Sequence, residues 1–200
     1  MKITILVEGE TEKAFKPILT QFLKARLEGN MPRLDFFPCE GRVYKEEKLR
    51  RTVAQLLHGR NPADAVIALT DVYTGTNDFT DAADAKTKMR QWVNNPAFYP
   101  HAAQHDFEAW LLPYWSDIQR LAGHNRTLPG TNPERINHQK PPAYHLIEIF
   151  RLGKRGSYNK PRDGMRILRN QDLLVAANAC PELKAFLNTI LRLSGGVVIP

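Results

Sequence analysis

Ile3-Thr4-Ile5-Leu6-Val7 is a short, mostly apolar and β-branched run that ends in Glu8-Gly9 and is followed by a helical pattern. The run predicts a buried β-strand with an acid at its carboxyl end. A second such run, residues 65–70, ends in Asp71. Ligands in open α/β sheets bind outside the carboxyl ends of the strands, and carboxylate oxygens are ligands that Mg²⁺ prefers. The strand-end acids therefore predict a magnesium site.

Helical and strand-like patterns alternate through the first half of the chain. The patterns predict strands over residues 3–7, 33–39, 65–70 and 98–104, and helices over residues 11–27, 45–58 and 81–93. Such alternation predicts an α/β fold with a mostly parallel sheet of about four strands, flanked by helices and joined by right-handed crossovers. A short helix over residues 106–112 is expected after the last strand.

The second half of the chain is expected to form a helical extension. Residues 123–142 contain scattered Pro, Gly, Asn and His and predict an extended connection. Helical patterns then cover residues 143–152, 163–179 and 181–193. The last residues, 194–200, are expected to be loose. We therefore expect an α/β metal-binding domain over residues 1–115, with a connection and a basic helical extension over residues 116–200 packed on it.

The composition indicates a protein that folds without covalent staples. The chain has 200 residues, of which 42% are hydrophobic, enough for a sizeable core. Cys39 and Cys180 show no paired spacing, so zinc sites and disulfide frameworks lack support. The sequence has neither a secretory core nor a run of the roughly 20 apolar residues that a membrane span needs. These features predict a cytoplasmic protein with no membrane partner.

Positive charge is concentrated in one segment of the chain. The formal net charge is +7, and residues 140–170 carry eight Lys or Arg against two acids, a local charge of +6. A polyanion such as nucleic acid is the partner that such a segment attracts. A solvated surface that keeps the protein soluble is an equally weighted alternative.

Further acids lie near the predicted strand ends. Glu10 and Glu12 follow the first strand, where like-charged carboxylates repel one another unless they share a cation. Glu108 follows the fourth strand, and His105 precedes it at a spacing that shares one face of a helix. We expect His105 to support the site, because Mg²⁺ prefers carboxylates to imidazole. A purely structural role as a helix cap or turn former stays open for Asp71.

Several motifs resemble those of a known family. Ile5-Leu6-Val7-Glu8-Gly9-Glu10-Thr11-Glu12 is similar to the opening motif of Toprim domains, the metal-binding α/β domains of topoisomerases, primases and OLD-type nucleases. The longer pattern resembles a Toprim-related bacterial family that is often encoded beside an AAA-type ATPase and that includes the nuclease effector of PARIS-type anti-phage systems. The further motifs are Thr70–Gly75, His105–Leu111, Ser157–Lys160 and Ala179–Leu183.

The resemblance implies a Toprim-like Rossmannoid fold and a Mg²⁺-dependent nuclease, a hydrolase of phosphodiester bonds in which Mn²⁺ can substitute. Glu8, Asp71 and Glu108 would bind the ion and act in catalysis. Toprim domains place a second acid two residues after the Asp of the third strand, whereas this chain has Tyr73 there. Glu108, or in second place Asp78, would supply the missing ligand.

The resemblance also gives the basic segment a role. Lys160 would neutralise charge on a phosphate oxygen in the transition state, and Arg155 and Arg162 would bind neighbouring phosphates. Glu10 or Glu12 would help to orient the attacking water. Without the resemblance, an exposed lysine at a helix end is the preferred interpretation of Lys160.

The implied partners are nucleic acid and an AAA-type ATPase that controls the nuclease in anti-phage defence. The chain has no P-loop motif, so ATP hydrolysis would need another subunit. Composition distinguishes neither DNA from RNA nor a monomer from a homodimer. The alternative is a non-catalytic regulatory subunit that binds nucleic acid or the ATPase, an alternative that Tyr73 keeps open. A nucleotide-binding or nucleotidyl-transfer protein is less favoured, since no glycine-rich phosphate loop follows a strand.

Overall fold

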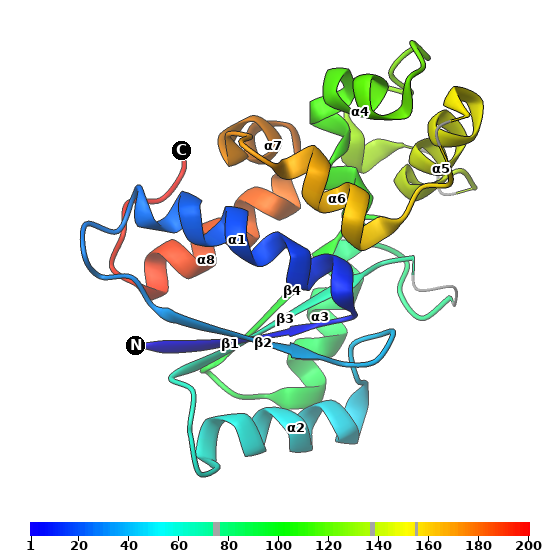
Figure 1. Ribbon diagram of the computed structural model, residues 1–200. Coiled ribbons are helices and arrows are strands. Elements are labelled where there is room, and N and C mark those ends of the chain that lie inside the picture. Colours follow the sequence, from blue (N-terminus) through cyan, green and yellow to red (C-terminus); the bar gives the residue numbers. More distant parts are fainter. Residues whose placement is uncertain (74–76, 137–138, 155) are drawn as a thin grey trace.

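The computed structural model describes residues 1–73, 77–136, 139–154 and 156–200, without the side chains of residues 10–14. Its centre is a four-stranded parallel sheet (Figure 1). The strands are β1 (Lys2–Val7), β2 (Arg33–Pro38), β3 (Ala65–Asp71) and β4 (Phe98–Ala103). Their order is β2-β1-β3-β4 and every neighbouring pair is parallel. The predicted α/β fold with a parallel sheet is confirmed.

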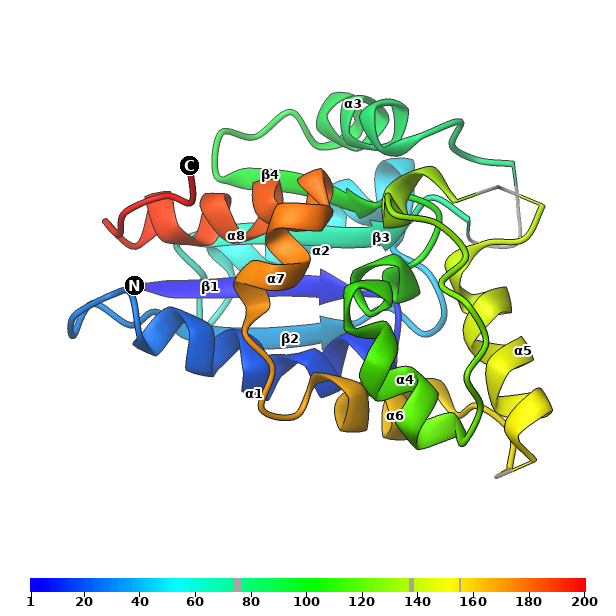
Figure 2. The same cartoon turned by 90° about the horizontal axis from the view of Figure 1, so that it is seen from above.

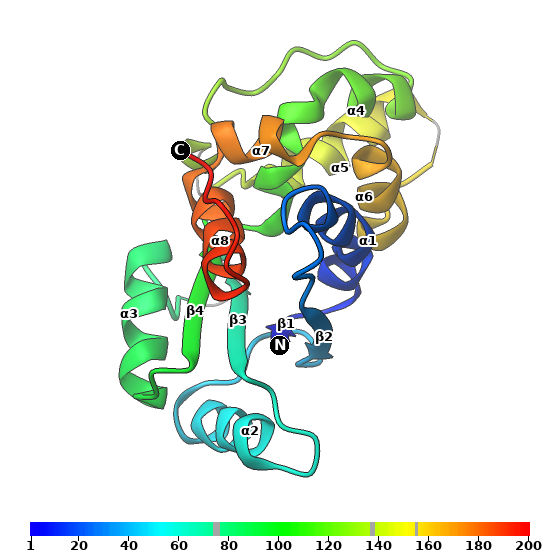
Figure 3. The ribbon, with the colours of Figure 1, turned by 90° about the vertical axis from the view of Figure 1, so that its left-hand side faces the viewer.

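Helices cover both faces of the sheet, as expected for a parallel sheet whose central strands are largely apolar and buried. One face carries α1 (Glu10–Lys24) and α8 (Pro181–Leu193), and the other carries α2 (Glu46–His58) and α3 (Ala82–Val93) (Figures 1 and 3). Side chains alternate between the faces along each strand. Ile5 and Ile67 belong to the core beneath α1 and α8, while Leu6 and Ala68 belong to the core beneath α2 and α3.

The helices of the second half of the chain gather beside α1 and beyond the carboxyl edge of the sheet (Figure 2). They are α4 (Trp115–Ala122), α5 (Pro142–Gly153), α6 (Lys160–Leu168) and α7 (Leu173–Ala179), with the short 3₁₀ helices η1 (Phe107–Trp110), η2 (Leu112–Tyr114) and η3 (Pro133–Arg135). Among the described residues, no helix is long and apolar enough to cross a bilayer.

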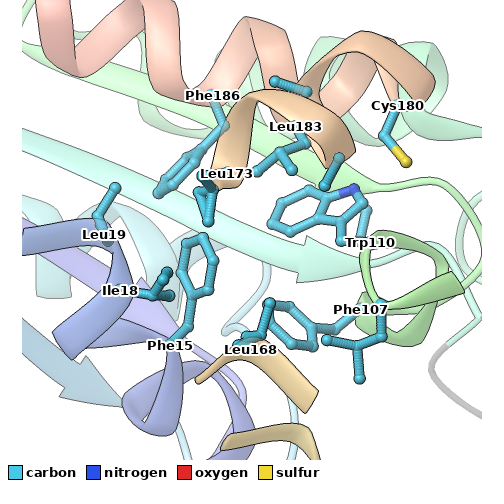
Figure 4. Close-up of a cluster of buried hydrophobic side chains, with 14 of the residues drawn as sticks. Phe15, Ile18, Leu19, Phe107, Trp110, Leu168, Leu173, Cys180, Leu183 and Phe186 are labelled. Atoms are coloured by element: carbon cyan, nitrogen blue, oxygen red, sulfur yellow. The ribbon is translucent and has the colours of Figure 1, made fainter. Parts of the chain in front are cut away.

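One hydrophobic core joins the sheet to this extension (Figure 4). The ring of Phe15 in α1 lies 5.5 Å from the ring of Phe107 and 6.2 Å from that of Trp110, measured between centroids. Trp110 in turn stacks on Phe186 of α8, with the centroids 6.0 Å apart. The extension therefore fixes η1 against the sheet, and η1 carries one of the predicted site acids.

Two predicted elements C-terminal to residue 115 differ from the structure. The helix predicted over residues 163–179 is two helices, because Asn170 adopts a left-handed conformation (φ 63°) and the side chain of Asp172 caps α7 by accepting a 2.9 Å hydrogen bond from the Leu174 N–H. The tail predicted to be loose is also held. The side chain of Asn188 bonds to both backbone groups of Ile199, at 2.7 and 3.0 Å, and Ile199 is buried.

Candidate active site at the carboxyl edge of the sheet

Glu8 and Asp71 lie at the carboxyl ends of the two central strands. The chain first adds β2 on one side of β1 and then crosses over to add β3 on the opposite side of β1. The direction in which the sheet grows therefore reverses between β1 and β3. Open α/β sheets bind ligands at such a switch point, outside the strand ends. The strand order could not be read from the sequence, and it places the two predicted acids on neighbouring strands.

The carboxylate of Glu8 is held in a fixed position. Its Oε1 accepts a 2.5 Å hydrogen bond from the Thr70 hydroxyl and a 3.0 Å hydrogen bond from the Asp71 N–H. Glu8 is 8% exposed and Thr70 is 2% exposed. Charge-assisted hydrogen bonds of this kind orient a buried carboxylate. The end of β3 therefore supplies both Asp71 and the donors that position Glu8.

Glu108 contacts two residues at and just before the start of α6. Glu108 is fully buried in η1. The ammonium of Lys160 lies 3.1 Å from Oε1 and 3.2 Å from Oε2 of Glu108, and the Tyr158 hydroxyl donates to Oε1 at 3.4 Å. Residues that are about fifty positions apart in the chain therefore meet at one carboxylate.

Asp106 adds another buried acid beside Glu108. Its Oδ2 accepts a 3.1 Å hydrogen bond from the Ala143 N–H, while its Oδ1 has no hydrogen-bond partner among the described residues. Burial, together with the charge of Glu108, raises the pKa of Asp106 to about 8. Among the described residues, Lys160 is the cation whose charge acts on both buried carboxyl groups. With its raised pKa, Asp106 is protonated near neutral pH, and a cation bound beside it would favour its ionised form.

Lys160 connects the two acidic groups electrostatically. Burial disfavours its ammonium, but the charges of Glu108, Asp71 and Asp106 outweigh that effect and raise the pKa of Lys160. The lysine side chain is 48% exposed, so it reaches from solvent to a buried carboxylate. Asp71 at the end of β3 and the acids around η1 therefore both act electrostatically on the Lys160 ammonium.

The start of α6 positions Lys160. Asn159 caps the helix by accepting a 3.0 Å hydrogen bond from the Arg162 N–H, and Pro161 occupies the first turn, as is common at helix starts. The buried carboxylate of Asp163 accepts from the Asn159 N–H at 2.8 Å and from the Arg162 guanidinium at 2.8 and 2.9 Å. Arg162 is thus engaged by Asp163, and its predicted contact with a substrate phosphate stays a prediction.

The prediction of one short α-helix over residues 106–112 is wrong. His105 adopts a left-handed conformation (φ 72°) and Asp106 is extended, so the chain forms η1 and then η2 instead of one α-helix. His105 and Glu108 therefore do not share a helical face. The carbonyl of His105 accepts a 2.6 Å hydrogen bond from the Tyr73 N–H, which joins the loop after β4 to the loop after β3.

The remaining predicted residues have other surroundings. Tyr73 is 45% exposed. Asp78 forms ion pairs with Arg42 and Lys45. The side chains of Glu10 and Glu12, and all of Arg155, lie outside the described residues.

The donor chemistry of the strand-end acids fits a hard divalent cation, because carboxylate oxygens are what such an ion binds. The orphaned Oδ1 of buried Asp106 fits a nearby cation as well. Within the described part of the chain, no three His, Cys, Asp or Glu side chains are grouped closely enough to hold an ion together. The metal set of Glu8, Asp71 and Glu108 stays a prediction.

Tyr158 was not recognised as a partner of Glu108 from the sequence. The structure packs its ring on Phe150, with centroids 5.4 Å apart, and directs its hydroxyl to Glu108. The only signal in the sequence was its place two residues before Lys160 in a motif shared with the resembling family.

The parallel order of the strands, with helices on both faces and acids at the central strand ends, defines an open α/β domain whose candidate site lies at the switch point of the sheet. A family model described as a domain of unknown function (DUF4276) matches residues 7–191, and the chain belongs to that family. The search of curated proteins found no match.

Solved structures with a similar fold were also found. The C-terminal region of the Burkholderia pseudomallei OLD protein is 12% identical, with a TM-score of 0.54 over 96% of this chain and 98% of that chain. The C-terminal region of the Xanthomonas campestris pv. campestris OLD protein is 14% identical, with a TM-score of 0.47 over 94% and 95% of the two chains. The first similarity supports the Toprim-like fold.

Proposed function

We propose that this protein is a metal-dependent nuclease that hydrolyses phosphodiester bonds of nucleic acid. The observation that carries the proposal is the pair Glu8 and Asp71 at the switch point of the sheet, linked by the 3.0 Å hydrogen bond from the Asp71 N–H. The motif resemblance to the Toprim domains of OLD-type nucleases supports the same chemistry.

The strand-end acids would hold the ion. Glu8, Asp71 and Glu108 would bind Mg²⁺ directly or through water, and Mn²⁺ can substitute. When bound, such an ion lowers the pKa of a water molecule and offsets the negative charge of the scissile phosphate.

The residues around the acids have distinct tasks in this proposal. Thr70 keeps the Glu8 carboxylate in place, and Tyr158 orients Glu108 through its hydroxyl. Lys160 is the cation that approaches the phosphate, because its side chain is half exposed while its ammonium is near both acidic groups. There it stabilises the negative charge that develops on a phosphate oxygen.

Control by a partner belongs to the same proposal. We propose that an AAA-type ATPase holds the nuclease inactive in the cytoplasm until phage infection releases it, as in the resembling PARIS-type systems. The chain itself lacks a P-loop motif, which supports a separate ATPase subunit.

Two observations favour a non-catalytic alternative. The Lys160 ammonium contacts both oxygens of Glu108, and Tyr73 replaces an acid of the Toprim pattern. In this alternative the Toprim-like domain binds nucleic acid or an ATPase without cleaving a phosphodiester bond.

Incubation of the purified protein with labelled DNA and RNA, with Mg²⁺, Mn²⁺ or EDTA, tests the proposal. We expect cleavage that requires the metal and that is lost in Glu8→Gln and in Asp71→Asn. Arg50→Gln is a suitable control, since Arg50 pairs with Glu47 on the exposed surface of α2. Nucleic acid binding without cleavage, unchanged in both acid variants, would instead establish the alternative.

A further inference from the structure

A basic cavity lies beside the candidate site, on the side of β2. The loop that follows β2 is joined to the strand end of β1, because the Cys39 N–H donates to the Val7 carbonyl and the Gly41 N–H to the Glu8 carbonyl, both at 2.8 Å. The cavity has a volume of about 380 Å³, and its lining includes Arg42, Lys45 and Lys48 but a single acid. Ligand pockets typically have volumes of about 300 to 1,000 Å³.

Arg42 and Lys45 already bind one anionic oxygen. Both cations contact Oδ2 of Asp78, Arg42 at 3.4 Å and Lys45 at close range. Asp78 comes from the loop after β3, and its carbonyl accepts a 2.9 Å hydrogen bond from Lys88. A carboxylate and a phosphate offer the same kind of oxygen to Arg and Lys. The Asp78 side chain therefore marks a place where two cations converge on an anion.

The wall of the cavity also carries an aromatic ring. Tyr44 is partly buried, and the ammonium of Lys48 lies 3.8 Å from the centre of its ring. A ring with a cation on its face, next to two further cations, is the combination with which proteins bind single-stranded nucleic acid. This surface and the basic start of α6 lie at the same edge of the sheet, where Figure 2 shows the strand arrows ending.

We propose that Arg42 and Lys45 bind a backbone phosphate of the nucleic acid substrate next to the scissile phosphate, and that Asp78 takes the place of this phosphate in the substrate-free protein. The inference rests on the proposed nuclease function. The substrate strand then runs from α6, across Glu8 and Asp71, to the loop between β2 and α2. Binding exchanges two ion pairs with Asp78 for two ion pairs with the phosphate.

Binding measurements on the double variant Arg42→Gln/Lys45→Gln test the inference. The probe is a short labelled single-stranded oligonucleotide, as DNA and as RNA, in EDTA so that no cleavage interferes. We expect an affinity about tenfold lower than that of the unmodified protein. The slope of log K against log salt should fall in magnitude by about 0.7 to 1, as expected when the contact to one phosphate is lost.

Arg50→Gln/Arg51→Gln is the matched control, because it removes the same charge from α2 residues that pair with Glu47. An equal loss of affinity and slope in the control and the double variant overturns the inference, as does a double variant that binds like the unmodified protein. If the unmodified protein binds neither oligonucleotide, the proposed function falls as well, so the two failures are distinguishable.

Asp78→Asn tests the exchange separately. This substitution removes the competing carboxylate and keeps the size of the side chain. We expect the affinity for the oligonucleotide to rise about two- to fivefold, since partly exposed ion pairs of this kind contribute up to about that factor. An affinity equal to or lower than that of the unmodified protein contradicts the exchange.

Discussion

Glu108 and Asp163 are both fully buried carboxylates that α6 serves with cations, yet their surroundings differ in charge balance. Asp163 is bonded by the guanidinium groups of Arg162 and Arg166 and by the Asn159 N–H. Burial alone would raise the pKa of Asp163, but these hydrogen bonds outweigh it and hold the pKa below its usual range. The hydrogen bonds to Asp163 therefore compensate its charge, and its role is structural.

Glu108 has one cation for two acids. Its partners are the Lys160 ammonium and the Tyr158 hydroxyl, while Asp106 beside it has its pKa raised to about 8 by burial and by the charge of Glu108. Two buried carboxyl groups that share one ammonium contribute little net stability, and a further cation would favour the ionised form of both. Asp163, whose charge is balanced by two guanidinium groups, therefore stabilises the fold. Glu108, which shares one ammonium with Asp106, is the candidate for catalysis.

The largest expected effect separates the two carboxylates by activity. Glu108→Gln should lower the rate of metal-dependent cleavage by about 100- to 1000-fold, because a carboxylate that faces the reacting phosphate and its ion is lost. The free energy of unfolding should stay within about 1 kcal/mol of that of the unmodified protein, since a buried, poorly compensated charge is removed. Cleavage assays and denaturant titrations measure both quantities. A variant that cleaves normally but unfolds easily would reverse the assignment.

Asp163→Asn should show the opposite pattern. The variant loses the charge that two guanidinium groups and a backbone N–H bind, and we expect the free energy of unfolding to fall by about 3 kcal/mol. Urea denaturation monitored by circular dichroism measures this loss. Full stability in Asp163→Asn would show that the balanced cluster contributes nothing to the fold. Arg169→Gln, at the end of the same helix, serves as the control for a lost charge.

A third buried carboxylate, Glu134, tests the same rule at a place where no ion pair is seen among the described residues. It accepts hydrogen bonds from the Trp110 ring N–H at 3.3 Å and from the Glu182 N–H at 3.2 Å. Burial raises its pKa from 4.5 to about 7. Because the folded pKa exceeds the unfolded one, the stabilising contribution is complete below about pH 4.5 and is lost as the pH rises through about 7.

The matched variant is Glu134→Gln, which does not titrate. Between those pH values we expect the unmodified protein to lose about 2 kcal/mol of unfolding free energy relative to the variant. Denaturant titrations of both proteins across the pH range measure this difference. Parallel pH profiles would contradict a raised pKa at Glu134.

Local pattern was enough to predict the sheet and two of its acids. The two central strands are short apolar runs, and Glu8 and Asp71 follow or end these runs, so their shared edge follows from parallel pairing alone. The strand order decides that these acids are on neighbouring strands, and it depends on which crossovers pack best, which no local pattern shows.

The surroundings of Glu108 depend on contacts between distant segments. A helical spacing of His105 and Glu108 was predicted, but the left-handed His105 starts a 3₁₀ turn instead. Tyr158 and Lys160 reach Glu108 only because α6 packs on α1 and η1 packs on the core. The sequence predicts a phosphate contact for Arg162 and places Arg166 in a basic segment, whereas both side chains pair with Asp163 in the structure. Charge compensation is a three-dimensional property and could not be predicted from composition.

The most direct test of the central claim is a crystal structure of the protein soaked in Mn²⁺, with the anomalous signal locating the ion. We expect an ion bound by carboxylate oxygens of Glu8 and Asp71, with Glu108 binding it directly or through water, and no ion at Asp163. Crystals in which Mn²⁺ leaves Glu8 and Asp71 without metal contacts, whether it binds elsewhere or nowhere, would contradict the assignment of this edge of the sheet as a metal-dependent active site.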